Sequence, residues 1–193
     1  MFKRSFFSFL FLFPSALLAS PLPYDDIVEP PVRSDEWNTD LKVWIGRSCV
    51  GEAGFHALDE CIAIAWVYSH RVAITGLSLM EVVRRYSAAI KKHSLHRRPW
   101  LLELNAELKR PKSWPPNLPW QSYRAQWKAL LEALDRWSVG QFANPVPGAD
   151  HFGSREDAYQ AVDKWRWKRL PAPSHFRNWF FDSSLKTTGR RQR

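Results

Sequence analysis

Residues 39–76 read TDLKVWIGRSCVGEAGFHALDECIAIAWVYSHRVAITG, and this stretch decides the fold. Its apolar residues recur every three or four positions, which is the period of an amphipathic helix, in two blocks on either side of Gly54. The first block predicts a helix that begins near residues 39–40, where good N-caps stand, and ends at Gly54. The second block predicts a helix over 58–74, which Gly76 stops.

The rest of the chain continues this helical pattern. Ser78 and Glu81 form a capping box that opens a third helix, which runs to Tyr86. The sequence also predicts helices over 100–109, 120–138 and 154–164. Short strands or irregular aromatic segments are expected within 165–182. The sequence therefore predicts a mainly α fold, with α+β as the alternative.

The composition limits the class of protein. The chain has 193 residues, 45% of them apolar, which suits the core of one domain and is too apolar for a disordered chain. Its 2 cysteines allow at most one bridge, so a disulfide-dense miniprotein is excluded. Only one apolar run approaches spanning length, which excludes a multi-pass membrane protein. A basic domain of net charge +9, rich in Trp, remains.

The amino terminus has the pattern of a secretory signal. Lys3 and Arg4 precede an apolar run over 6–18, and the small residues Ala19 and Ser20 follow it. This run is shorter than the ~20 residues of a transmembrane helix, although an uncleaved anchor or a buried helix is the alternative. We therefore expect an exported protein, periplasmic or extracellular, with no stable membrane insertion after the signal is removed.

The expected division of the chain follows from these segments. In order, the parts are a signal peptide over 1–20, an extended lead-in over 21–35, a folded domain over 36–183 and a basic tail over 184–193. The sequence contains no internal repeat, and we expect a monomer.

The chain's cysteines, Cys49 and Cys61, lie on the apolar faces of the first two predicted helices. A short turn joins these helices, so they should pack antiparallel. A disulfide would then close a loop of about a dozen residues and contribute roughly 2–3 kcal/mol. Two buried free thiols are the alternative. The His and Cys spacings do not suit a metal site, and we expect no metal and no cofactor.

Glu52 is the residue whose position says most about chemistry. It follows Cys49 by three positions, so it shares the apolar face, and it falls at the carboxyl end of the first predicted helix. The partial negative charge of a helix end and the exclusion of water by aromatic neighbours both raise the pKa of a carboxyl group. A carboxyl that stays protonated near neutral pH suits a general acid for glycosidic cleavage, although an ordinary exposed Glu is the alternative.

Two segments carry a family resemblance. The first is GEA at 51–53, continued by AIAWVYSHRV at 63–72, and the second is NPVPGADHF at 144–152. Their order and spacing resemble the cell wall hydrolases of the spore-cortex-lytic type, which have Gly-Glu-Ala, then Ala-Val-x-x-Val-x-x-Asn-Arg-Val, and later Asn-Pro-x-x-Gly-Ala-x-x-Phe. The resemblance covers about residues 40–180, with 90–140 unmatched.

The family resemblance implies a lysozyme-like domain that acts on the glycan strands of peptidoglycan, with Glu52 as its catalytic acid. The further positions that we expect to line the glycan cleft are Tyr86, Ser87, Asn144, Asp150, His151 and Phe152. For several of these an ordinary role is the alternative, such as a core Tyr with a capping Ser or a turn-forming Asp. His56, Cys61 and His70 depart from the family pattern, which bears on substrate preference more than on reaction class.

Two reaction outcomes stay open. A hydrolase needs a second carboxylate ~5–10 Å from the acid, and Asp150 is the best candidate. A lytic transglycosylase needs only Glu52, because the sugar's own 6-hydroxyl attacks and yields an anhydro product, and we favour this outcome. The alternatives of other classes are a non-enzymatic periplasmic wall-binding or scaffold protein and, less favoured, a basic nucleic-acid-binding domain.

The Trp residues divide by their predicted place. Those on helix faces are expected in the core: Trp44, Trp127 and Trp137. Those in loops are candidates for flat surfaces that stack on sugars: Trp100, Trp114 and Trp167. The basic runs would attract the chain to an anionic wall.

Overall fold

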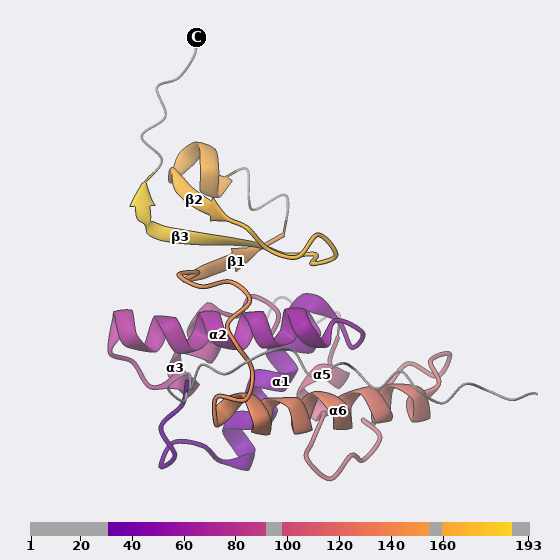
Figure 1. The fold of residues 1–193 in the computed structure, drawn as a ribbon. Coiled ribbons are helices and arrows are strands. Elements are labelled where there is room, and N and C mark those ends of the chain that lie inside the picture. The colour runs from indigo at the N-terminus through magenta and orange to yellow at the C-terminus, as the bar shows by residue number, and fades with distance from the viewer. Residues whose placement is uncertain (1–30, 92–97, 155–159, 187–193) are drawn as a thin grey trace, which may run out of the picture.

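The computed structural model describes residues 31–91, 98–154 and 160–186 of the chain. In these ranges a group of helices is followed by a small sheet near the C-terminus (Figure 1), which confirms the predicted mainly α fold with short strands. The signal peptide predicted over 1–20 lies outside the described residues, as does most of the lead-in predicted over 21–35.

The first two helices confirm the prediction from the opening stretch. They are α1 (Thr39–Ala53) and α2 (Leu58–Thr75). The cap of α1 is Asn38, just before the expected position, and its side-chain oxygen accepts a hydrogen bond from the Leu41 backbone N–H at 2.9 Å. Gly54 ends the helix with φ +90°, a backbone conformation that other residues rarely adopt.

Helix α1 lies at the centre of the helical part. It packs against α2, α3 (Leu79–Tyr86), α5 (Trp100–Glu103) and α6 (Trp120–Ser138). Buried residues occur all round it, as expected of a helix enclosed by others. Trp127 and Trp137 of α6 are fully buried, as predicted, whereas Trp44 of α1 is only half-buried and lies between Arg47 and Arg84.

One helix is shorter than its prediction. The segment 100–109 forms only the single turn of α5, because the side chain of Asn105 bonds to backbone groups that a longer helix would use. Its amide donates to the Glu103 carbonyl at 3.0 Å, and its oxygen accepts from the Lys109 N–H at 3.0 Å. Asn competes with helical hydrogen bonding in this way.

The segment predicted as a helix over 154–164 is described only in its last part. There it forms one turn of π-helix, η1 (Gln160–Lys164). The predicted start of that helix lies in 155–159, outside the described residues.

The strands form an antiparallel sheet in the order β1-β3-β2, with β1 (His151–Gly153), β2 (Trp167–Leu170) and β3 (Trp179–Lys186). In the register of β1 and β3, His151 pairs with Phe181. β3 extends to residue 186, so the domain boundary predicted at 183 falls inside this strand and not after it.

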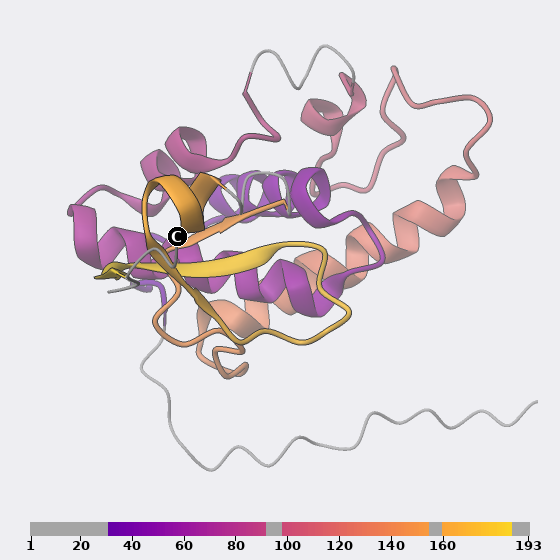
Figure 2. The same ribbon diagram turned by 90° about the horizontal axis from the view of Figure 1, so that it is seen from above.

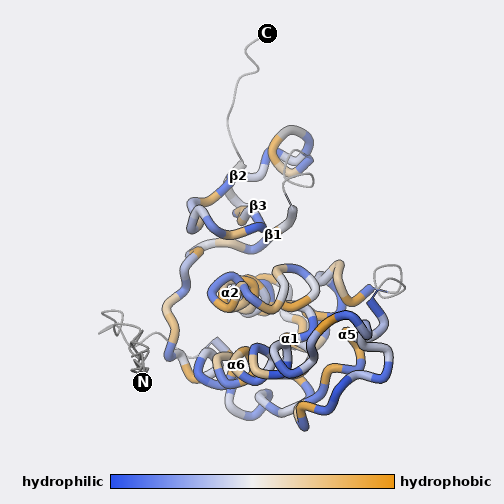
Figure 3. Tube along the Cα trace, turned by 90° about the vertical axis from the view of Figure 1, so that its right-hand side faces the viewer, coloured by the Kyte–Doolittle hydropathy of each residue, from blue (hydrophilic) through white to orange (hydrophobic). Residues whose placement is uncertain are grey.

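The sheet lies on α2, and α2 lies between the sheet and the other helices (Figures 2 and 3). Phe180 of β3 is fully buried, and Phe152 of β1 contacts the ring of Tyr68 on α2 at a centroid distance of 5.7 Å. Helix α2 is therefore covered on opposite sides, which explains its nearly continuous apolar sequence.

Among the described helices, none is long and apolar enough by itself to cross a membrane. Helices α2 and α3 meet that test of length and composition only as a pair, bent by 111° at the break between them.

Candidate active site

Glu52 lies in the last turn of α1, and its carboxylate contacts the end of α3. Its Oε1 accepts hydrogen bonds from the Ser87 hydroxyl at 3.1 Å and from the Ala89 backbone N–H at 2.9 Å. Ser87 is fully buried and forms the C-cap of α3. The structure therefore brings together two residues that were predicted for the site from distant parts of the sequence.

The surroundings of Glu52 act on its pKa in opposite directions. Burial is the largest effect and raises the pKa, because a poorly hydrated site disfavours the carboxylate. The hydrogen bonds from Ala89 and Ser87 and the positive charge of Arg98 lower it. The net result is a pKa above the usual value of 4.5. No basic residue in the last turn of α1 offsets the negative helix end.

Tyr68 of α2 belongs to this cluster, although the sequence placed it only on an apolar helix stripe. It is fully buried, and its hydroxyl lies 2.5 Å from the Ser48 hydroxyl. Burial and, after it, the charge of Glu52 raise the pKa of Tyr68 well above its usual value, so it stays a protonated phenol. A hydroxyl within an otherwise apolar stripe must find a buried partner, and that requirement was the available signal.

Tyr86 contacts the other predicted residues through Arg71 of α2. The Arg71 guanidinium lies over the Tyr86 ring, 3.7 Å from its centroid, and its Nε donates to the Asp150 backbone carbonyl. Arg71 is buried, so these contacts replace its hydration. It thereby connects the end of α3 to the start of β1.

The carboxylate of Asp150 accepts three hydrogen bonds from neighbouring residues. Oδ1 accepts from the Ser183 backbone N–H at 2.9 Å and is bonded to His151 Nδ1 at 2.9 Å, while Oδ2 accepts from the Ser183 hydroxyl. Burial raises the pKa of Asp150, but these hydrogen bonds and the adjacent His151 outweigh it and lower the pKa to about 2. Asp150 is thus an ionised carboxylate that ties β1 to β3.

The remaining predicted residues, Phe152, His151 and Asn144, contact different parts of the structure. Phe152 contacts Tyr68, and the His151 ring lies against the Trp167 ring, with 3.9 Å between the ring centroids. Asn144 has a local role, because its side-chain oxygen accepts from the Val146 backbone N–H at 2.9 Å, as in a turn. Within the described ranges no contact joins it to Glu52.

Cys49 and Cys61 are both buried free thiols in this structure, so the predicted disulfide is not formed in it. The predicted packing of the two helices does bring the cysteines together. The Cys49 thiol donates to the Cys61 carbonyl at 3.3 Å and also lies in hydrogen-bonding contact with the Cys61 thiol. Burial is the main reason that the pKa of Cys49 lies well above its usual value, which keeps this sulfur protonated.

Glu60 is a buried carboxylate that sequence reasoning missed. Its oxygens accept from the backbone N–H groups of Arg177 and Asn178, at 3.0 and 2.7 Å, and from the Asn178 side-chain amide at 2.8 Å. That amide also contacts the carbonyl oxygen of Glu52, at 3.5 Å. Glu60 therefore fixes the loop before β3 against the end of α1. An acidic residue in the first turn of a helix usually needs no such partner, so the sequence held no clear signal.

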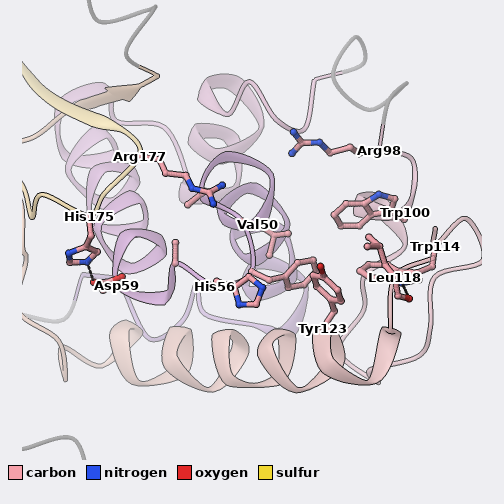
Figure 4. A pocket seen from close by; sticks show the side chains of 14 residues that line it. Val50, His56, Asp59, Arg98, Trp100, Trp114, Leu118, Tyr123, His175 and Arg177 are labelled. Carbon is pink, nitrogen blue, oxygen red and sulfur yellow. Dashed lines mark hydrogen bonds and ion pairs between the residues drawn. The ribbon is translucent and has the colours of Figure 1, made fainter. Parts of the chain in front are cut away.

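A cavity of about 400 Å³ opens directly after Glu52 in the chain, at the turn between α1 and α2 (Figure 4). Its aromatic walls are formed by Phe55, His56, Trp100, Trp114 and Tyr123. Trp114 is only 4% exposed, and its Nε1 donates to a backbone carbonyl in its own loop, so it supports the wall and is not the free stacking surface predicted for it. Trp100 is half-buried and stacks on Phe55 at 5.9 Å.

No protein-family model matches the chain, and no curated protein or solved structure matches it either. A functional argument therefore depends on the chemistry of the site itself.

Proposed function

We propose that this chain cleaves the glycan strands of peptidoglycan, with Glu52 as the general acid. The observation that carries the proposal is the state of that carboxyl group. It is partly removed from water at the end of a helix, its pKa is raised, and Ser87 and Ala89 both donate hydrogen bonds to its Oε1. Glycosidic cleavage requires a carboxylic acid of this kind to protonate the leaving oxygen. The resemblance of the 51–72 and 144–152 segments to cell wall hydrolases supplies the substrate class.

The proposed reaction is that of a lytic transglycosylase. Glu52 gives its proton to the glycosidic oxygen as the bond from that oxygen to the sugar's C1 breaks. The resulting carboxylate then accepts the proton of the same sugar's 6-hydroxyl, whose oxygen bonds to C1 and closes an anhydro ring. Glu52 ends in its starting form, and no water is consumed. Ser87 and Ala89 stabilise the carboxylate during the step in which it is ionised.

The state of Asp150 favours this outcome over hydrolysis. A hydrolase would use a second carboxylate to activate water or to bond with the sugar. Both oxygens of Asp150 already accept hydrogen bonds from Ser183 or His151, and the group is only 4% exposed. A buried carboxylate that already accepts three hydrogen bonds is poorly placed to activate water, so the proposal assigns the chemistry to Glu52 alone.

The first test is clearance of purified peptidoglycan sacculi, followed as loss of turbidity. We expect the wild-type protein to clear them and Glu52→Gln to be slower by about 10²–10⁴-fold, because Gln cannot donate the proton. Glu107→Gln is the matched control, since Glu107 is an exposed Glu whose partner is the exposed Lys109. Equal clearance by the wild type and Glu52→Gln, or no clearance by the wild type of sacculi that a known muramidase clears, would contradict the proposal.

The second test is mass analysis of the released fragments. A transglycosylase leaves anhydro sugars, which are lighter than hydrolysis products by one water. Hydrated ends in place of anhydro ends would overturn the transglycosylase assignment while leaving Glu52 as the acid. Turbidity and mass together therefore separate the residue's role from the reaction type.

A further inference from the structure

The cavity beside Glu52 combines an aromatic wall with two guanidinium groups. Figure 4 shows Arg177 on the left of it, Arg98 at the top above Trp100, and Trp114 and Tyr123 toward the lower right. A volume of about 400 Å³ lies within the range of small-ligand sites. A site of this composition holds an apolar or ring-shaped group against the aromatic side chains and an anion against the arginines.

The charges that face the cavity favour an anionic ligand. Neither Arg98 nor Arg177 forms an ion pair within the described part of the chain, and one Nη of Arg98 donates to the Gly51 carbonyl at 3.0 Å. Among the described residues that line the cavity, Asp59 is the acidic one, and His175 is paired with it. The cationic groups are therefore available to a ligand, whereas the acidic group is engaged.

The backbone of Arg177 is held in place before any ligand binds. Its backbone N–H donates to the buried Glu60 carboxylate at 3.0 Å, and its neighbour Asn178 bonds to the same group. A Cβ built on Gly54 would lie 3.6 Å from Nη1 of Arg177, so the guanidinium lies close to the turn that follows Glu52. The fixed backbone therefore keeps the base of this side chain at the cavity.

We propose that this cavity is a second recognition site, which binds the carboxylate-bearing peptide carried by the glycan strand. The inference rests on the proposed function for the identity of the strand. Arg177 and Arg98 bind a peptide carboxylate, and the aromatic wall of Phe55, Trp100 and Tyr123 packs against the adjoining aliphatic or sugar groups. Ala53 and Gly54, which directly follow the proposed catalytic acid, line the cavity, so the bound peptide would lie next to Glu52.

The test measures binding separately from cleavage. Isothermal titration uses Glu52→Gln protein, so that the ligand survives, with two probes: a disaccharide-tetrapeptide muropeptide and the same compound with its carboxyl groups methyl-esterified. We expect the acid to bind about tenfold more tightly than the ester, as one lost charge-assisted contact predicts. Adding Arg177→Gln should reduce that difference, because only Arg98 then remains for the carboxylate, while Arg124→Gln, which changes an exposed arginine of α6, should preserve it.

The outcomes are distinguishable from those of the catalytic tests. Equal binding of acid and ester by the Glu52→Gln protein, or no binding of either, overturns the recognition site even where sacculi are cleared. Binding that depends on Arg177 and on the carboxylate supports it even where sacculi are not cleared, in which case only the proposed catalysis fails. Trp100→Leu provides a second check, because it should weaken both probes by a similar factor and leave the acid-to-ester ratio unchanged.

Discussion

At the scale of single residues, the molecule holds two carboxyl groups in opposite states. Glu52 is half-buried, and its pKa is raised, whereas Asp150 is buried and accepts hydrogen bonds from His151 and Ser183, and its pKa is lowered to about 2. The difference comes from the balance of effects: burial outweighs the hydrogen bonds at Glu52, whereas the hydrogen bonds and the adjacent His151 outweigh burial at Asp150. Opposite states of this kind separate a proton donor from a structural carboxylate.

The raised pKa of Glu52 predicts how Glu52→Gln changes stability. A carboxyl whose folded pKa lies above its unfolded value stabilises the fold below the unfolded pKa, and this contribution is lost as the pH rises through the folded pKa. Gln does not titrate. Thermal unfolding at pH 4 and pH 7 should therefore show Glu52→Gln gaining in melting temperature relative to the wild type at the higher pH. A difference between the two proteins that is constant with pH would contradict this expectation.

Ser87→Ala should move the pH dependence of cleavage. The Ser87 hydroxyl favours the ionised form of Glu52, so its removal raises the pKa of Glu52 further. The alkaline limb of the pH-rate profile, where the acid loses its proton, is then expected at higher pH. Ser113→Ala is the matched control, because Ser113 donates to the carboxylate of Glu103 at the surface. An unmoved alkaline limb in Ser87→Ala would argue against Glu52 as the acid.

Asp150→Asn should cost stability. Because its pKa is lowered, the carboxylate contributes about 2 kcal/mol to the free energy of unfolding at pH values above 3.8, its usual pKa. This contribution is lost as the pH falls toward 2. Denaturant unfolding should thus show a loss of about 2 kcal/mol at pH 7 that shrinks on acidification. Asp35→Asn, at an exposed ion pair with Arg33, should change little. An equal loss at pH 7 and pH 3 would show that the hydrogen-bond geometry, and not the charge, is responsible.

Sequence reasoning singled out Glu52 as a candidate because its signal is local: a carboxylate on an apolar face at a helix end. It named Ser87 and Phe152 as candidates through the resemblance. It could not assign Asp150, because the group that occupies this carboxylate, Ser183, lies in another strand 33 positions away. The same holds for Glu60, whose partners follow it by more than a hundred positions. Long-range pairing of this kind leaves no periodic trace in the sequence.

At the scale of elements, the packing of α1 against α6 depends on the absence of a side chain at Gly46. A Cβ there would lie 2.6 Å from Trp127, whose ring is anchored by a 2.8 Å hydrogen bond from Nε1 to the Asn105 carbonyl. Alanine normally stabilises a helix by up to about 1 kcal/mol relative to glycine. Here the close contact outweighs that gain.

Gly46→Ala is therefore expected to destabilise the fold by about 1–3 kcal/mol, as overpacking does. Denaturant unfolding measures the loss, and a double-mutant cycle with Trp127→Leu identifies its cause, because the smaller side chain should relieve most of it. Gly76→Ala is a useful contrast: its Cβ would meet nothing within 4 Å, and its cost of about 1–2 kcal/mol would come from φ +68° alone. Stabilisation by Gly46→Ala would contradict the close packing.

Helices α1, α2, α3 and α6 were predictable from sequence. Glycines mark the ends of α1 and α2, and α3 and α6 have strong apolar periodicity. The segment 100–109 was not, because Asn105 redirects backbone hydrogen bonds there. The strands were expected only as short elements, and their order was not predictable. The order β1-β3-β2 places the last strand in the middle, and only pairings between distant residues specify it.

At the scale of the whole molecule, the buried Glu60 connects the sheet region to the helices. Glu60→Ala would leave the amides of Arg177 and Asn178 without their acceptor, at a cost of about 3 kcal/mol. Hydrogen exchange followed by mass spectrometry should show faster exchange in 171–178, with α6 unchanged. Glu60→Gln keeps one acceptor oxygen, so its exchange rate in 171–178 should lie between those of the wild type and Glu60→Ala. Unchanged exchange in 171–178 would show that packing, and not this carboxylate, holds the loop.

The placement of these partners also governs when the site becomes complete. The donors that fix Glu60 and Asp150 are Arg177, Asn178 and Ser183, and all of them follow the helices in the chain. A nascent or C-terminally truncated chain can form the early helices and carry Glu52, yet it lacks the loop and the strand that finish the surroundings. The loop whose Asn178 contacts the Glu52 carbonyl would thus be in place only after residues 177–183 have been synthesised, later than the helices that carry Glu52 and Ser87.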